Sequence, residues 1–272
     1  RNYAAAQVNR LTEGWTTSNL SANTEIAASL DNLRGRSRQL ARDNEYIQKC
    51  LALVATNIAG PAGFNFQARI YDAAGTPDTP ANKAVERAWR QWSARGVCDV
   101  AGRMSLCDFE HLLTKTAARD GEFLVRIIRG AAAGNAFGFA LQALDSDRLD
   151  TRLNRPAGDG MNQIRMGIEL SMYGRPVAYW LRSRHPGEMY AASGEQGATH
   201  MVLPADDVIH GFIADRPEQV RGVPWAHAAM QRLNNLGGYE EAAVVAARVG
   251  AAKMGFFQKT EGAPEVLDGQ AD

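Results

Sequence analysis

The sequence predicts an α+β protein in which a helical N-terminal region comes first, an antiparallel sheet second and one long helix last. Three observations support this fold class. The hydrophobic period is mainly helical up to Asp120, it alternates from there to about Phe212, and it becomes helical again after Pro224. Strands and helices do not alternate along the chain, so a doubly wound parallel sheet is excluded.

Helices with polar capping residues dominate the first part of the chain. They are predicted to begin at Asn23 (or the next residue), at Asn44, near Asn82 and at the capping box that Ser105 opens. Between the second and third helices, Phe64–Tyr71 alternates in hydrophobicity and predicts a strand.

Strands follow one another after Asp120, separated by short turns. The predicted strands are Glu122–Arg129, Phe137–Leu144, Gln163–Leu170 and Pro176–Arg182, with two shorter ones around Met201–Leu203 and Val208–Phe212. Because the connections are tight, we expect an antiparallel meander.

A long helix is expected from about Trp225 to Gly250. Pro224 fits the first helical position, where its missing N–H costs nothing, and Trp225 is expected to anchor the helix against the sheet. Residues Glu240–Ala252 are almost entirely Ala, Val and Gly. Such a stretch suits either a core helix among small residues or a helix packed against copies of itself, because small side chains let helix axes approach closely.

The composition is that of a soluble globular protein. Of the 272 residues, 45% are hydrophobic and 22% are charged, which excludes a disordered chain. Thirty basic residues balance thirty acidic ones, so the strong basic excess of proteins that wrap nucleic acid is missing. The longest apolar stretch, Ala242–Phe257, is interrupted by Arg248 and Lys253, and no membrane span is expected. Three cysteines argue against a disulfide framework.

The two ends of the sequence resemble cut ends. The chain begins at Arg1 without Met, and it stops in a polar stretch that starts at Glu261. We therefore expect a fragment of a longer protein. The first twenty residues are polar and predict an arm, with Trp15 as its anchor.

Sequence patterns of catalysis are weak. Asp145, Asp147 and Asp150 follow a predicted strand and fit either a hard-metal site or a turn whose carboxylates bind backbone amides. The five histidines form no metal-binding spacing, and no nucleophile elbow, P-loop or dinucleotide fingerprint is present. The favoured interpretation is a non-enzyme without cofactor or metal. The alternative is a metal-dependent nucleic-acid-processing enzyme that uses the three aspartates.

A basic cluster marks the first predicted helix. Arg34, Arg38 and Arg42 are spaced by four residues and share one helix face. Three interpretations remain open: a solvated surface, a contact with an acidic neighbouring subunit, and a contact with DNA phosphates.

Several motifs, in order, cover nearly the whole chain. They centre on Asp120, Gly121 and Glu122; on Gly174, Arg175, Pro176 and Trp180; and on Arg221, Gly222, Pro224 and Trp225. Together they resemble the lambda-type family of tailed-bacteriophage portal proteins.

The resemblance implies a fragment of the phage portal fold. The arm would be residues 1–22, a wing-like α+β domain residues 23–224, a stem-like helix residues 225–255 and the start of a clip-like segment residues 256–272. It also implies a structural ring, commonly of twelve subunits, at the portal vertex of the virion, assembled in the host cytoplasm. Its partners would be packaged double-stranded DNA, the terminase motor, major capsid and scaffold proteins and head–tail connector proteins, without a membrane.

Overall fold

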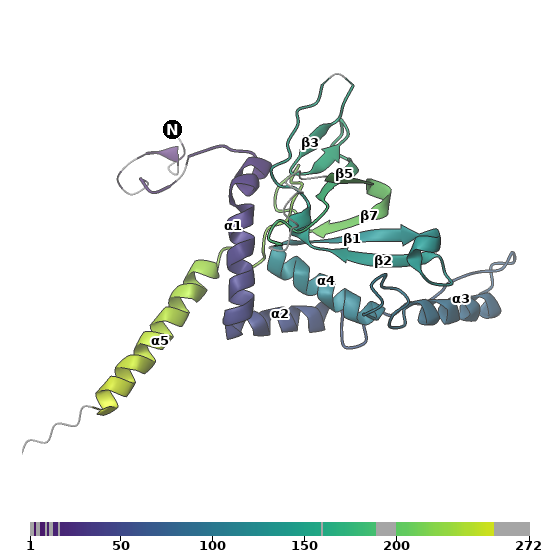
Figure 1. Cartoon of the computed structure of the whole chain (residues 1–272), viewed down its shortest axis with the longest axis horizontal. Helices are drawn as coiled ribbons and strands as arrows, with labels where there is room; N and C mark the ends of the chain where they lie inside the picture. Colours follow the sequence, from purple (N-terminus) through teal and green to yellow (C-terminus); the bar gives the residue numbers. More distant parts are fainter. Residues whose placement is uncertain are drawn as a thin grey trace, which may run out of the picture. The chain divides into compact units, whose positions relative to one another are not determined.

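The computed structural model describes residues 3, 6–8, 10, 13–15, 17–158, 160–188 and 200–252. Its architecture is α+β, as predicted, with helices first, antiparallel strands next and a long helix last (Figure 1). The α-helices are α1 (Ala22–Asp43), α2 (Glu45–Ile58), α3 (Thr79–Trp92), α4 (Leu106–Asp120) and α5 (Met230–Ala252). The segment predicted as the start of a clip, residues 256–272, lies outside the described residues.

Side-chain caps fix where the first helices begin. Ser21, two residues before the predicted cap, accepts a hydrogen bond from the backbone N–H of Thr24 and starts α1. Asn44 caps α2 as predicted. Ser105 and Asp108 form the predicted reciprocal capping box of α4, which satisfies backbone donors that the first helical turn leaves open.

The strands form two antiparallel sheets. They are β1 (Glu122–Arg129), β2 (Phe139–Leu144), β3 (Gln163–Arg165), β4 (Ile168–Leu170), β5 (Pro176–Arg182), β6 (His200–Pro204) and β7 (Val208–Phe212). One sheet has the order β2-β1-β7 and the other β3-β4-β5-β6. The antiparallel connections from β3 to β6 follow the predicted meander, but the single strand predicted at Gln163–Leu170 is a hairpin of β3 and β4. In addition, β7 returns to pair with β1.

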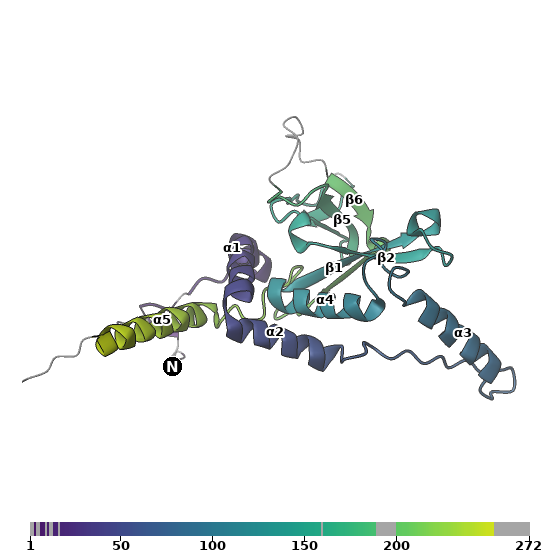
Figure 2. The same ribbon diagram turned by 60° about the horizontal axis from the view of Figure 1, so that its bottom comes forward.

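The main core lies where the two sheets face each other. Side chains from both sheets meet there, including Leu124 of β1, Leu181 of β5 and Leu203 of β6. A second, smaller apolar cluster joins α1 to this body through Leu30 and Met166. Figure 2 shows α4 running beside the sheet of β1 and β2, and α1 and α2 pack against α4.

The prediction of a strand at Phe64–Tyr71 is wrong. Its residues are extended, but their backbone N–H groups bind side chains instead of a neighbouring strand: Phe64 donates to Glu110, and Ile70 donates to Asn82. Hydrophobic alternation thus marks an extended chain here, and not membership of a sheet.

The long helix starts later than predicted, because residues 225–229 form turns and α5 begins at Met230. Pro224 is therefore not its first residue. Trp225 is 37% exposed, so it is not the buried anchor that the sequence suggested. Residues from Gln231 onward form a unit of their own. None of the helices in the described ranges has the length and apolar character that a membrane crossing requires.

Two backbone segments touch where α4 ends. Gly121 closes α4 in the left-handed conformation, with φ of 90°. A Cβ atom on Gly222 would lie 2.0 Å from the carbonyl oxygen of Gly121, and one on Gly121 would lie 2.3 Å from the carbonyl carbon of Val223. The backbone N–H of Trp225 also donates to Ala118, at 3.0 Å. Only glycine allows this approach.

We expect Gly222→Ala to destabilise the fold by about 1–3 kcal/mol, because the new methyl group has no space. Gly35→Ala is the matched control: Gly35 lies within α1 with nothing within 4 Å of the position of its Cβ, so alanine should stabilise the helix by up to about 1 kcal/mol. Urea unfolding of both variants measures the difference. Equal stabilities would show that the two segments do not touch.

Candidate functional site

A fully buried carboxylate lies at the centre of the motifs that sequence analysis singled out. Glu122, the first residue of β1, receives the guanidinium of Arg221 at 2.6 Å from Nη2 to Oε1. Arg34 of α1 approaches the same oxygen, with 2.7 Å between Nη2 and Oε1. The other oxygen, Oε2, accepts the backbone N–H of Gly222 at 3.0 Å and pairs with Nε2 of His210 at 3.2 Å.

Arg221 binds backbone as well as side chain. Its Nη1 donates to the carbonyl of Met166 at 2.9 Å, and its Nη2 donates to that of Ser146 at 3.3 Å. The residue is fully buried, so each of these bonds replaces water that a buried guanidinium has lost. Arg221 thereby ties the segment before α5 to the turn after β2 and to the turn between β3 and β4.

A second buried carboxylate extends the network toward the surface. Asp120, the last residue of α4, accepts from Arg38 Nε at 2.9 Å and from Arg119 Nη2 at 2.7 Å. The backbone carbonyl of Asp120 accepts from Arg34 Nε at 3.0 Å. Arg34 and Arg38, one helical turn apart on α1, thus reach the two acidic residues that flank Gly121.

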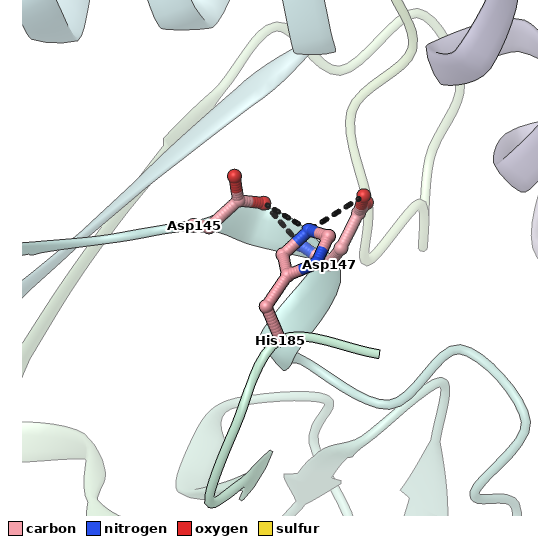
Figure 3. A group of neighbouring side chains, drawn as sticks. All are labelled: Asp145, Asp147 and His185. Atoms are coloured by element: carbon pink, nitrogen blue, oxygen red, sulfur yellow. Dashed lines mark hydrogen bonds and ion pairs between the residues drawn. The ribbon is translucent and has the colours of Figure 1, made fainter. Parts of the chain in front are cut away.

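Asp145 and Asp147 close the network at its exposed side. Arg38 donates to Asp145 at 3.0 Å from Nη2 and also to Asp147 from Nη1. His185 lies against the same two aspartates, with Nε2 3.5 Å from Oδ2 of Asp147 (Figure 3). The ligand atoms of Asp145, Asp147 and His185 lie within 4.8 Å of one another. Arg38 already binds both carboxylates, so a cation among these three residues would compete with its guanidinium.

Charges in this network, which we call the ionic junction, balance. Its ion-paired carboxylates are Glu122, Asp120, Asp145 and Asp147, and its guanidiniums are Arg34, Arg38, Arg119 and Arg221. Four negative and four positive groups give no net charge. A junction of this kind fixes the relative position of α1, β1 and the segment before α5.

Electrostatics of the two buried acids follow from their partners. Burial by itself raises the pKa of Glu122, but Arg221, Arg34 and His210 outweigh it and hold the pKa well below the usual range. Burial also acts against ionisation of Asp120, and hydrogen bonds from Arg119 and Arg38 lower its pKa below the usual value. Both acids are therefore charged in the folded protein at neutral pH.

Asp150 belongs to a different cluster. Its carboxylate accepts from Arg182 Nη2 at 2.6 Å and pairs with His200 Nε2 at 2.9 Å. Burial disfavours the charged form, but the bonds from Arg182 and His200 outweigh it and lower the pKa of Asp150 to about 2. The three aspartates that sequence analysis considered as one metal site are thus divided between two sets of arginine partners.

The three arginines of the basic cluster, for which a solvated surface, a subunit contact and a DNA contact were open, have separate roles. Arg34 is 1% exposed and contacts carboxylates of its own chain, unlike the solvated or partner-facing position that the sequence suggested. Arg38 is partly buried in the ionic junction. Arg42 is exposed at the end of α1. Only Arg42 retains a side chain on the surface for an outside contact.

Other motif residues shape the second sheet. Gly174 occupies the turn between β4 and β5 with φ of 77°, and Arg175 and Pro176 lead from it into β5. The indole N–H of Trp180 donates to Glu169 at 3.1 Å. These residues build a hairpin and are not part of the ionic junction.

Sequence reasoning missed the pairing of Glu122 with Arg221. A signal for it exists: Glu122 precedes Leu124 on the face of β1 that faces the core, and Arg221 lies between apolar neighbours. A charged residue at a buried position implies a buried partner of opposite charge. An acidic and a basic residue that both fall at buried positions of one domain are therefore expected to pair.

We expect Glu122→Gln to destabilise the fold by about 3–5 kcal/mol, because two buried guanidiniums lose their anion. Glu25→Gln is the matched control: Glu25 pairs with Arg216 at 2.8 Å, but the side chains are 49% and 47% exposed. Its loss should cost no more than about 1 kcal/mol. Chemical unfolding of both variants gives the comparison, and similar values for the two would contradict a stabilising role of Glu122.

Asp150 should contribute stability that depends on pH. Its folded pKa of about 2 lies below the ordinary value of 3.8, so the contribution is present above pH ~4 and is lost as the pH falls toward 2. We expect Asp150→Asn to lower the unfolding free energy at pH 7 and to have a smaller effect near pH 2. Unfolding curves at both pH values test this, and a difference that does not change with pH would contradict it.

Comparisons with known proteins agree with the motifs. The sequence matches the family described as phage portal protein, lambda family, over residues 8–272. It is 36% identical over 261 residues to a probable portal protein of Halomonas phage phiHAP-1, an alignment that covers 95% of this chain and 49% of that protein. The chain therefore spans about half the length of this curated relative. The resemblance deduced from the motifs is confirmed, and the chain belongs to the lambda family of phage portal proteins.

Proposed function

We propose that this chain is part of a subunit of the portal ring, the structural channel at one capsid vertex through which the phage genome is packaged and ejected. The family match over residues 8–272 carries this proposal. The relative in Halomonas phage phiHAP-1 bears the name of a probable portal protein. A ring of identical copies needs a heterologous interface, in which one surface of a subunit meets a different surface of the next.

The long helix supports an assembly of several chains. From Gln231 onward the described residues of α5 are exposed or half-exposed, and its valines Val244, Val245 and Val249 are each about half exposed. A helix of 23 residues with such an apolar surface needs cover from elsewhere. Neighbouring copies that pack their α5 helices around a channel would provide it, as the small residues of this helix allow.

The parts of the chain then take the positions implied by the family. Residues 1–22 would form the arm, residues 23–224 the wing, residues 225–255 the stem, with its helix from Met230, and residues 256–272 the beginning of the clip. The ionic junction holds the wing rigid where it leads into the stem. Double-stranded DNA would pass through the channel. The terminase, capsid, scaffold and connector proteins would bind the outer surfaces in the virion.

A structural role is favoured over the metal-dependent enzyme. Asp145 and Asp147 both pair with Arg38, and Asp150 pairs with Arg182 and His200. Among the described residues, the group that could hold a metal ion is Asp145, Asp147 and His185; it does not include Asp150, and Arg38 binds both of its aspartates. The enzyme alternative therefore has no support.

Mass and symmetry of the full-length protein test the proposal. We expect light scattering to give a mass near twelve subunits and negative-stain images to show closed rings with a central hole. The physical reason is that a heterologous interface generates a ring when its rotation closes. A monodisperse monomer or dimer at micromolar concentration would contradict the portal function.

A further inference from the structure

An uncovered aromatic groove lies along α3. Its walls are the helix itself and the β1–β2 hairpin, and it has a volume of about 300 Å³. The lining residues are Val85, Ala88, Trp89, Trp92, Phe137 and Phe139. The rings form a continuous series, with centroids 5.1 Å apart between Trp89 and Trp92 and 5.5 Å apart between Trp92 and Phe139. This volume is at the lower end of ligand pockets and suits one large aromatic side chain.

An extended segment with a free backbone edge borders the groove. Phe66 stacks on Trp89, with centroids 4.6 Å apart, and the N–H groups of Phe64, Ala68 and Ile70 bind side chains of the chain itself. In an extended chain the N–H groups of alternate residues point to opposite sides. Those of Asn65, Gln67 and Arg69 therefore point the other way, and within the described ranges they have no partner.

The N-terminal arm carries exposed aromatic side chains that could fill such a groove. Trp15, the expected anchor, is 66% exposed, and Tyr3 is 89% exposed. The arm joins the body at the first turn of α1. In both ribbon views α1 and α3 lie on opposite sides of the body that α4 and the sheets form. One chain thus presents an uncovered aromatic groove on one side and uncovered aromatic side chains on the other.

We propose that the arm of one copy docks on the α3 groove of a second copy, with Trp15 in the groove and the arm backbone paired to the edge at Gln67. This inference rests on the proposed function, because a ring requires two unlike surfaces that meet head to tail. Addition of a strand to a free edge gives binding through main-chain hydrogen bonds, and a pocket for one side chain gives specificity.

Disulfide trapping between two full-length proteins tests the contact directly. One protein carries Trp15→Cys and the other Phe137→Cys, both with Cys50→Ser and Cys107→Ser to remove accessible native thiols. Mixed under mild oxidation, they should form a covalent heterodimer. The matched control replaces Phe137→Cys by Tyr173→Cys, because Tyr173 is an exposed aromatic residue on the β4–β5 turn, away from α3, and should give at least tenfold less product.

Backbone pairing is tested by a pair of variants at one position. Gln67→Pro removes the backbone N–H of residue 67, whereas Gln67→Ala removes the side chain and keeps that N–H. Trp15→Ser should weaken ring assembly by about tenfold or more, as expected for an aromatic hot spot, and Gln67→Pro should weaken it more than Gln67→Ala. Unchanged melting temperatures would show that the variants act on assembly alone, since Trp15 and Gln67 are exposed.

The outcomes separate this inference from the portal function. If the wild-type protein forms rings but the Trp15→Cys and Phe137→Cys variants form no crosslink, the docking is wrong and the portal function stands. Normal ring assembly by Trp15→Ser has the same meaning. A crosslink within one chain, seen with both cysteines in the same protein and no dimer, also overturns it. A heterodimer crosslink in a protein that forms no ring would sustain the docking and contradict the portal function.

Discussion

The carboxylate of Glu122 is the constraint on which the rest of the body depends. Removing this group from water is unfavourable unless cations and hydrogen-bond donors surround it. Three separate parts of the chain supply its partners: Arg34 from α1, His210 from β7 and Arg221 from the segment before α5. None of these three can move away without leaving a buried charge exposed to a low dielectric. Charge pairing at the ionic junction therefore fixes where α1, β7 and the segment before α5 lie, and apolar contacts hold the two sheets together.

Close backbone approach accompanies the charge pairing. Gly121 and Gly222 follow or precede the paired residues directly, and their missing side chains let the end of α4 touch the segment that leads toward α5. The Gly222 N–H completes the shell of Glu122. Two motifs, separated by about a hundred residues, are thus one structural unit. Their joint presence in the sequence reflects a single packing requirement.

Local patterns predicted most elements, and tertiary contacts account for the differences. The strands Glu122–Arg129 and Pro176–Arg182 were predicted with their observed bounds, because alternation and flanking turn residues coincide there. Phe64–Tyr71 alternates equally well, but carboxylate and amide side chains took the place of a partner strand. Arg34 was assigned to the surface by its charge, although its spacing of four from Leu30 puts it on the buried stripe of α1. The aspartates were recognised, but their arginine partners come from elements remote in sequence, and no local pattern reports them.

The long sequence separation within the ionic junction has a consequence for folding order. Arg221 lies 99 residues from Glu122, and Arg34 lies 86 residues from Asp120, so these contacts are of high contact order. During synthesis, β1 emerges well before the segment that neutralises it. Until that segment is available, burial of Glu122 lacks one of its two arginine partners and is unfavourable. The body can therefore reach its native packing only after the segment around Arg221 has been synthesised. The first half of the chain thus depends on this later segment for cooperative folding.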